Sequence, residues 1–383
     1  MSLLFTESFM AFEKTSLADN NAAMTTLRTN TLRSLVAAGY AGNFTVVSNG
    51  GFVVRPDPVI PERQALVHSA ATFNNGTSSF RFNLAASGDT VIGGFSLFVP
   101  LAWQPSPAYQ YVMSVSFIVS AANAAYQPTQ DINAPVAGEM MRIRFDGGIA
   151  YGGEVQSSKK VTPGKQVYFE YRLTPTELRV WCDDTLVLQK TVALTREVLT
   201  INVHEWGDYG ATSGMYGAAG AWAFSNFYLL KEDAVDPKVR LGPSTRVIGV
   251  RPASDVIAQF ARPTGYASNA AVAALAFNPD GTSFLKTDTV GTKDVYTPAP
   301  DDETATAALV HAVNVKVMGQ NLEAATHLMR ATVSSGGSEQ GTSKALPASI
   351  GLINHVSITN PATGQAWTPS DAATSNFGMT LET

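Results

Sequence analysis

The chain has 383 residues, a length that suggests two domains, and 45% of its residues are apolar, enough to build a core in each. Only 15% are charged, below the roughly 25% of an average globular protein, and the net charge of −5 argues against a nucleic-acid-binding surface. So few charges suit either a protein packed against neighbours or an all-β domain rich in Ser, Thr and Asn.

Cysteine usage and hydropathy argue against further classes of protein: disulfide-bonded, secreted and membrane-spanning. The single cysteine, Cys182, excludes a disulfide within the chain. The first residues, MSLLFTESF, have neither the basic start nor the apolar core of a secretory signal peptide. No run of about 18 apolar residues predicts a membrane span. We expect a protein made in a cytoplasm, with no membrane partner.

The first predicted elements are a short strand, LLFTESF, and one amphipathic helix within residues 16–39. Ser16 is the expected N-cap and Gly39 the expected C′ residue. The apolar side chains near one face of this helix are Met24, Leu27, Leu32, Leu35 and Val36. Such a helix is typical of a cap on one end of a sheet.

From Phe44 onward the hydrophobic period changes to two. Short strands alternate with turn pairs such as Asp146-Gly147 and Asp183-Asp184, and the last strand of this half reads AWAFSNFYLL. In VYFEYRL the expected faces are Tyr168, Glu170 and Arg172 on one side and Phe169, Tyr171 and Leu173 on the other. Many short strands with one helix predict a two-sheet sandwich or jelly roll.

The charged, proline-containing segment KEDAVDPKVRLGPST predicts a linker over residues 233–245, between domains at residues 1–232 and 246–383. The second domain is expected to open with TRVIGVRP and DVIAQFARP. In AALVHAVNVKVMG, one face of a strand would carry Leu309, His311, Val313, Val315 and Val317. The terminal strand FGMTLE follows a loop in which Trp367 is expected to be buried. The fold class is therefore predicted as all-β, with two β-sandwich (jelly-roll-like) domains and one short N-terminal helix.

Both halves resemble known families. LLFTESF, VYFEYRLTPTELRVWCDDTLVL and GAWAFSNFYLL, within about residues 1–230, resemble concanavalin-A-like (laminin-G-like) jelly rolls, with Asp183-Asp184 in place of the usual Asp-Gly and Asn226 in place of the closing Asp. LGPSTRVIGVRPASDV, PDGTSFL and NPATGQAWTPSDAATSNFGMTLE, within roughly residues 238–383, resemble the C-terminal module of tailed-bacteriophage virion proteins, although Gln259-Phe260 stands where Trp is common. The second resemblance implies a virion structural protein of the tail, neck or capsid surface, and not an enzyme.

The best candidate recognition site lies in NVHEWGDYG and the glycine-rich residues that follow. Its members are His204, Trp206, Asp208, Tyr209 and Tyr216. Aromatic faces in a glycine-rich loop can stack on sugars or on a protein partner, but a connection with a partly buried Trp has the same composition. Glu205 and Asp208 could act as an acid–base pair on a glycoside. We expect no catalysis, because the Glu-x-Asp-x-x-Glu motif of jelly-roll glucanases is absent.

No metal or cofactor is expected. The five histidines never occur in pairs with ligand spacing, and His311 and His327 are expected as packing residues within alternating strands. The acidic segments PDDETAT and RPASDV lack the spacing of an EF-hand calcium loop.

The leading hypothesis is a non-enzymatic bacteriophage virion protein located on the particle. Its expected partners are other virion proteins (capsid, neck or tail) and copies of itself, as a homo-oligomer or multi-copy decoration. The alternative is a host-receptor or glycan-binding appendage that aids adsorption. A polysaccharide-degrading enzyme is a third hypothesis, against which the missing carboxylate motif counts.

Overall fold

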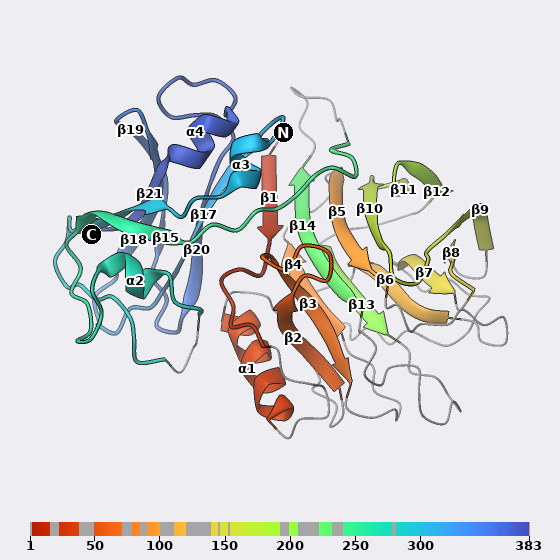
Figure 1. The fold of residues 1–383 in the computed structure, drawn as a ribbon, viewed down its shortest axis with the longest axis horizontal. Helices are drawn as coiled ribbons and strands as arrows, with labels where there is room; N and C mark the ends of the chain where they lie inside the picture. The colour runs from red at the N-terminus through yellow and green to blue at the C-terminus, as the bar shows by residue number, and fades with distance from the viewer. Residues whose placement is uncertain are drawn as a thin grey trace. The chain divides into compact units, whose positions relative to one another are not determined.

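A computed structural model describes residues 2–15, 23–37, 50–70, 79–84, 90–99, 111–119, 139–144, 146–151, 154–191, 199–205, 222–231, 240–277 and 281–382. The chain falls into two compact units, one of residues 1–9, 14–32 and 40–247, the other of residues 10–13, 33–39 and 248–383. Strands dominate both units (Figure 1). The prediction of an all-β fold is confirmed.

The first unit contains fourteen of the strands that the structure describes. They are β1 (Ser2–Glu7), β2 (Gly50–Pro56), β3 (Gln64–Ala70), β4 (Ser79–Leu84), β5 (Val91–Phe98), β6 (Tyr111–Val119), β7 (Glu139–Arg144), β8 (Gly148–Tyr151), β9 (Glu154–Lys160), β10 (Gln166–Leu173), β11 (Glu177–Cys182), β12 (Thr185–Thr191), β13 (Leu199–Glu205) and β14 (Ala223–Lys231). Helix α1 (Met24–Ala37) contributes residues to both units. The expected helix start at Ser16 and end at Gly39 lie outside the described residues.

These strands form two antiparallel sheets. The eight-stranded sheet has the order β12-β11-β10-β5-β14-β3-β2, with β1 also paired to β14, and the six-stranded sheet has the order β4-β13-β6-β7-β8-β9. Aromatic rings fill the core, where the ring centroid of Phe95 lies 5.5 Å from those of Phe169 and Phe227. Buried Met141, Ile143 and Ile149 come from the second sheet, as a sandwich requires.

The predicted hairpin turns are present. Asp183 and Asp184 join β11 to β12 with φ angles of 44° and 66°, the backbone that a tight two-residue hairpin needs. Gly147 has a φ of 83° between β7 and β8. At one side of the sandwich, the Gln156 side chain of β9 accepts a hydrogen bond of 2.7 Å from the Gln189 N–H of β12. This contact links the edge strands of the two sheets and leaves them less able to pair with another chain.

The second unit holds a five-stranded and a two-stranded sheet. Its strands are β15 (Pro252–Ala258), β16 (Lys293–Pro298), β17 (Val313–Gly319), β18 (Leu328–Ser335), β19 (Ser338–Ala345), β20 (Gly351–Ser357) and β21 (Asn376–Glu382). The larger sheet has the order β15-β16-β21-β18-β19, and β17 pairs with β20. Three short helices, α2 (Asn269–Ala273), α3 (Asp302–Thr306) and α4 (Pro369–Thr374), interrupt the strands.

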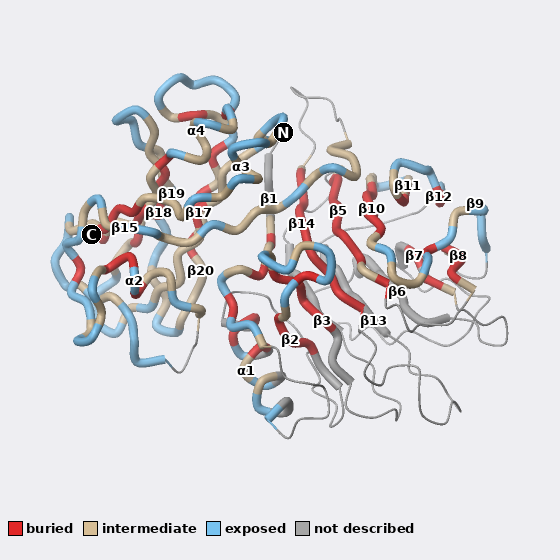
Figure 2. The backbone as a smooth tube through the Cα atoms, in the orientation of Figure 1, coloured by how far each residue is buried: buried red, intermediate tan, exposed pale blue. Residues whose placement is uncertain are grey.

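The last segment of the chain builds the centre of this unit. Asn360 and Gly364 close the expected loop through a 2.8 Å backbone bond, with Gly364 at a φ of 68°. Trp367 is 2% exposed and packs with Phe260 and Leu381. Strand β21 then lies between β16 and β18, so it is an interior strand of the sheet. Buried and half-buried residues make up β18, whereas most residues of β19 are exposed (Figure 2).

Several local predictions for this part of the chain were wrong. Leu309 and His311 precede β17 and are exposed, because the strand begins only at Val313. His327, expected within a strand, lies just before β18. The segment TRVIGVRP contains no strand residue before Pro252, where β15 begins. Strands β16 and β19 and the three short helices were not predicted.

The predicted linker also differs from the structure where both can be compared. Residues 233–239 lie outside the described residues, but residues 240–245 are not an open connection. They lie on the eight-stranded sheet of the first unit, where Leu241 and Val247 pack against Ile92 and Tyr228. The two units meet in sequence at residues 247 and 248.

Candidate functional site

The predicted recognition residues fall almost entirely outside the described residues. Trp206, Asp208, Tyr209 and Tyr216 all lie in the undescribed stretch 206–221. His204 is placed by its backbone alone, in β13, opposite Ser79 of β4 and Ser114 of β6. The recognition loop therefore remains a prediction from the sequence.

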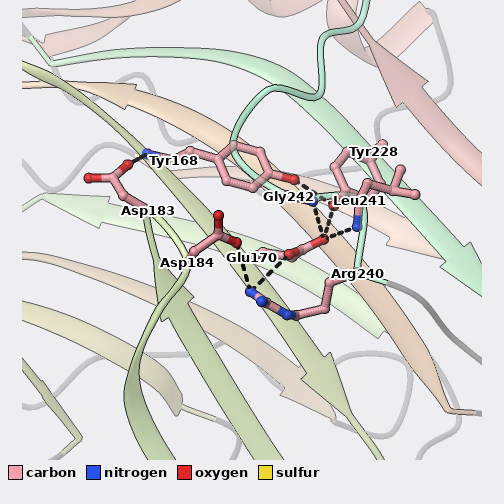
Figure 3. Close-up of polar contacts among 8 residues, drawn as sticks. All are labelled: Tyr168, Glu170, Asp183, Asp184, Tyr228, Arg240, Leu241 and Gly242. Carbon is pink, nitrogen blue, oxygen red and sulfur yellow. Dashed lines mark hydrogen bonds and ion pairs between the residues drawn. The ribbon is translucent and has the colours of Figure 1, made fainter. Parts of the chain in front are cut away.

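The most developed polar site that the structure describes surrounds Glu170, on the face of the eight-stranded sheet that points away from the Phe169 core (Figure 3). The Glu170 side chain is 1% exposed, although it comes from the middle of strand β10. Its Oε1 accepts hydrogen bonds from the Tyr228 hydroxyl at 2.7 Å and from the Leu241 N–H at 2.6 Å. A longer contact of 3.4 Å comes from the Gly242 N–H.

Residues 240–247, here called the strap, cover this carboxyl group. Arg240 places Nη1 3.5 Å from Glu170 Oε2 and 3.3 Å from Asp184 Oδ1. Its guanidinium carbon lies 4.6 Å from the centroid of the Trp181 ring, within range of a cation–π contact. At the other end of the strap, the Val247 N–H donates to Asn226 Oδ1 at 3.1 Å.

The strand positions explain how the sheet accommodates these groups. Asn226 adopts a φ of 57° within a bulge of β14, which directs its carboxamide toward Ser96 and the strap. Gly94 of β5 lies opposite both Glu170 and Tyr228. A Cβ at Gly94 would stand 2.6 Å from the Tyr168 hydroxyl and from Tyr228 Cε1, so glycine makes room for the two rings.

Burial dominates the electrostatics of this site. It raises the pKa of the Glu170 carboxyl above its ordinary value, and the hydrogen bonds and Arg240 lower that pKa only in part. Burial also raises the pKa values of Tyr168 and Tyr228, whose hydroxyls lie 2.6 Å apart. The sequence placed Tyr168 and Glu170 on one face but gave no sign that the strap would cover them. The one local signal of a buried carboxyl group was Glu170 itself, an acidic residue within the largely apolar run VYFEYRL.

A second buried polar cluster lies in the second unit. Asp294 is fully buried and accepts hydrogen bonds from the N–H groups of Gln259 and Phe260, at 2.6 and 2.9 Å. Asn269 Nδ2 and the Tyr296 hydroxyl donate to its other oxygen at 2.8 and 2.9 Å. Because Asp294 is fully buried and each of its oxygens accepts two hydrogen bonds from the surrounding chain, this carboxylate has a structural role.

The acidic segments considered for calcium have structural roles. Asp301 caps helix α3 by accepting a 3.0 Å bond from the Thr304 N–H. Asp255, from RPASDV, accepts bonds from the N–H groups of Asn269 and Ala270 at the start of α2. Within the described part of the chain, no three His, Cys, Asp or Glu side chains are grouped to hold a metal ion.

The histidines and the cysteine are placed separately. His355, inside β20, is buried and shares a 2.9 Å hydrogen bond with Thr342, while burial and Arg330 lower its pKa. His327 contacts Glu323 at 3.0 Å. Cys182 is buried, and burial raises the pKa of its thiol to about 12, which makes it unreactive at neutral pH.

Eight large apolar side chains in the described part of the second unit are exposed. Among the described residues of this unit they are Val250, Val256, Leu275, Phe284, Val290, Leu309, Leu322 and Ile358. Leu322 is 79% exposed and Phe284 53%. Exposed apolar groups of this kind supply binding free energy when a partner covers them. No helix among the described residues is long and apolar enough to cross a membrane.

Comparisons with known proteins give only distant likenesses. No protein-family model and no curated protein sequence matches the chain. Among solved structures, the carbohydrate recognition domain of Emp46p matches at a TM-score of 0.32 with 11% identity, covering 49% of this chain and 94% of that domain. The carbohydrate-binding module CBM66 from Bacillus subtilis matches at 0.26 with 10% identity, covering 49% of this chain and 97% of the module.

A sialidase matches at a TM-score of 0.27 with 11% identity, over 49% of this chain and 17% of the sialidase. The matched part is therefore a small fraction of that enzyme. All three scores are below 0.5, so none of these proteins lends its activity to this chain.

Proposed function

We propose that this chain is a non-enzymatic structural protein of a tailed-bacteriophage virion, attached to the particle through its second unit. The observation that carries the proposal is the set of exposed apolar side chains on that unit, which includes Phe284 and Leu322. With few charges in the whole chain, such a surface is suited to being covered by neighbouring proteins.

The C-terminal sequence pattern supports the same proposal. Its Asn360, Trp367 and Gly378 form one continuous piece of the fold, in which the loop, the buried ring and the interior strand depend on one another. The likeness to phage virion proteins rests on that pattern.

Co-sedimentation with phage particles from the source culture tests the proposal. The full chain is added to particles that lack it, and binding is compared for Phe284→Ser, Leu322→Ser and the control Leu186→Ser. Leu186 is a similarly exposed apolar residue of the first unit. Exposed substitutions change stability by only about 0.5 kcal/mol, so differences report binding.

We expect the two variants of the second unit to bind particles at least about tenfold more weakly, while Leu186→Ser binds as well as the unaltered chain. Failure of the unaltered chain to sediment with particles would refute the virion proposal. Undiminished binding of Phe284→Ser and Leu322→Ser would contradict attachment through this surface of the second unit, and equal loss in all three variants would show that the effect is not specific to that unit.

A second candidate function is binding of a host-surface glycan by the first unit. The observation in its favour is the aromatic set Trp206, Tyr209 and Tyr216 in a glycine-rich segment. It predicts saturable binding of the full chain to host envelope polysaccharide, lost in Trp206→Ala and retained in Phe284→Ser. Release of reducing ends, abolished in Glu205→Gln, would instead indicate a polysaccharide-degrading enzyme.

A further inference from the structure

The strap is fastened by an uncommon kind of anchor, a carboxyl group buried within a sheet. Glu170 holds the Leu241 N–H, while Arg240 holds Glu170 Oε2 from the other side. We propose that Glu170 makes the strap a pH-sensitive element, held most firmly while the carboxyl group is protonated and more loosely once it ionises. The proposal does not depend on the function proposed above.

The hydrogen-bond geometry allows the strap to stay in place around a neutral carboxyl group. Both strap N–H groups, from Leu241 and Gly242, approach the same oxygen, Oε1. A protonated carboxyl group keeps one oxygen as a carbonyl acceptor, so these bonds remain when the proton is on Oε2. The Tyr228 hydroxyl also donates to Oε1, and this hydrogen bond remains for the same reason.

Ionisation, by contrast, places a negative charge on a side chain that is 1% exposed, and the three hydrogen bonds and Arg240 compensate for the lost hydration only in part. Among the described residues, Arg240 is the one cation within ion-pair distance of Glu170, and its Nη1 lies 3.5 Å from Oε2. Asp184, in the turn after β11, lies closer to the same nitrogen and shares its charge. A buried carboxylate with one distant, shared cation is poorly stabilised.

The other groups around this face do not change that balance. Tyr168 on β10 and Tyr228 on β14 stay neutral at physiological pH, because burial raises the pKa of each. Arg172 lies two residues along β10 on the same face, where its charge adds to that of Arg179 in lowering the pKa of Glu177. Arg246, at the far end of the strap, is exposed and turns back to the carbonyl groups of Pro243 and Thr245.

The direction of the pH effect follows from linkage. When the strap opens, water reaches Glu170 and its pKa returns toward the ordinary value of 4.5. When the strap closes, burial raises that pKa, so the closed form binds the proton more tightly. The closing equilibrium is therefore most favourable below the ordinary pKa and weakens as pH rises through the raised pKa.

Hydrogen exchange of the full chain tests this. The readouts are protection factors for the Leu241 and Gly242 amides between about pH 4 and about pH 8, a range that spans ordinary and raised carboxyl values. Protection factors remove the intrinsic pH dependence of exchange. Amides of Phe169 and its neighbours in β10 report whether the sheet itself opens. We expect strap protection to fall severalfold with rising pH while protection in β10 does not.

Two substitutions of Glu170 separate charge from hydrogen bonding. Glu170→Gln keeps an acceptor oxygen without a titrating group, so the strap should stay protected with no pH dependence. Glu170→Ala leaves buried donors unpaired, and protection should drop about tenfold or more at every pH. Asp146→Asn, at the β7–β8 turn, where the carboxyl group pairs with Arg144 and Lys160, serves as the control and should keep the pH dependence. The proposal is overturned if strap protection in the unaltered chain does not fall as pH rises, or if Glu170→Gln retains that fall.

Discussion

Replacement of Trp367 provides the most direct test of how the second unit is held together. The indole ring is 2% exposed in a core that includes Phe260 and Leu381, and its Nε1 donates to the Ser357 carbonyl at 3.0 Å. Removing a buried Trp side chain costs about 3–5 kcal/mol. Since the Ser357 carbonyl also loses its donor, we expect Trp367→Ala to lie near the upper end, at about 5 kcal/mol.

Trp367→Phe separates packing from hydrogen bonding. Phe keeps most of the ring in the core but has no N–H, so its cost should be about 1–3 kcal/mol. Hydrogen exchange of the full chain measures both variants, through amides of β18 and β21, with β5 and β10 of the first unit as the internal reference. A change of 1.4 kcal/mol corresponds to about tenfold in exchange. Trp367→Ala should therefore accelerate exchange in the second unit by roughly three orders of magnitude.

The reasoning would be refuted by either of two results. Acceleration of less than about tenfold in Trp367→Ala would mean that the ring contributes little to the core. Equal effects of the Ala and Phe substitutions would mean that the hydrogen bond, and not the buried ring, carries the stabilisation.

Three further predictions concern the same unit. Gly378→Ala should lower the free energy of unfolding, measured by urea titration, by about 1–3 kcal/mol or more, because a Cβ there would lie 2.2 Å from the Asp294 carbonyl oxygen; an unchanged free energy would contradict the close strand approach. Asp294→Ala should cost at least about 3 kcal/mol in the same titration, since it strands several buried donors, and Asp294→Asn should cost less. The lowered pKa of His355 predicts stability that is full above its ordinary value of 6.5 and lost as pH falls through the lowered value. His355→Gln should remove that part of the acid sensitivity, which paired urea titrations on either side of the ordinary value would show.

Strand alternation and turn chemistry were sufficient to predict the all-β fold and much of its local detail. The Asp183-Asp184 turn, the buried Trp367 and the strand after Asn376 all follow from local residue patterns. The three short helices have local signals that periodicity over a longer window does not register. Thr368-Pro369 starts α4 with a capping hydroxyl and a proline at its first turn.

The Glu170 site could not be predicted, because its burial depends on long-range packing. Alternation places Glu170 and Tyr168 on one face of β10, and such a face is ordinarily exposed to solvent. Here the strap, about 70 residues further along the chain, covers that face and makes both sides of the strand buried. A segment with charges and prolines has the composition of a linker. Composition alone does not reveal the long-range contacts that bind this segment to the sheet.

The pairing of β1 with β14 has a consequence for synthesis on the ribosome. Thr6 lies opposite Tyr228, and the eight-stranded sheet places β14 between β5 and β3. At about 5–20 residues per second, roughly 10 to 40 seconds pass between the emergence of β1 and that of its partner. During this interval β1 has no partner strand, so its unpaired backbone groups must stay clear of every other exposed strand edge.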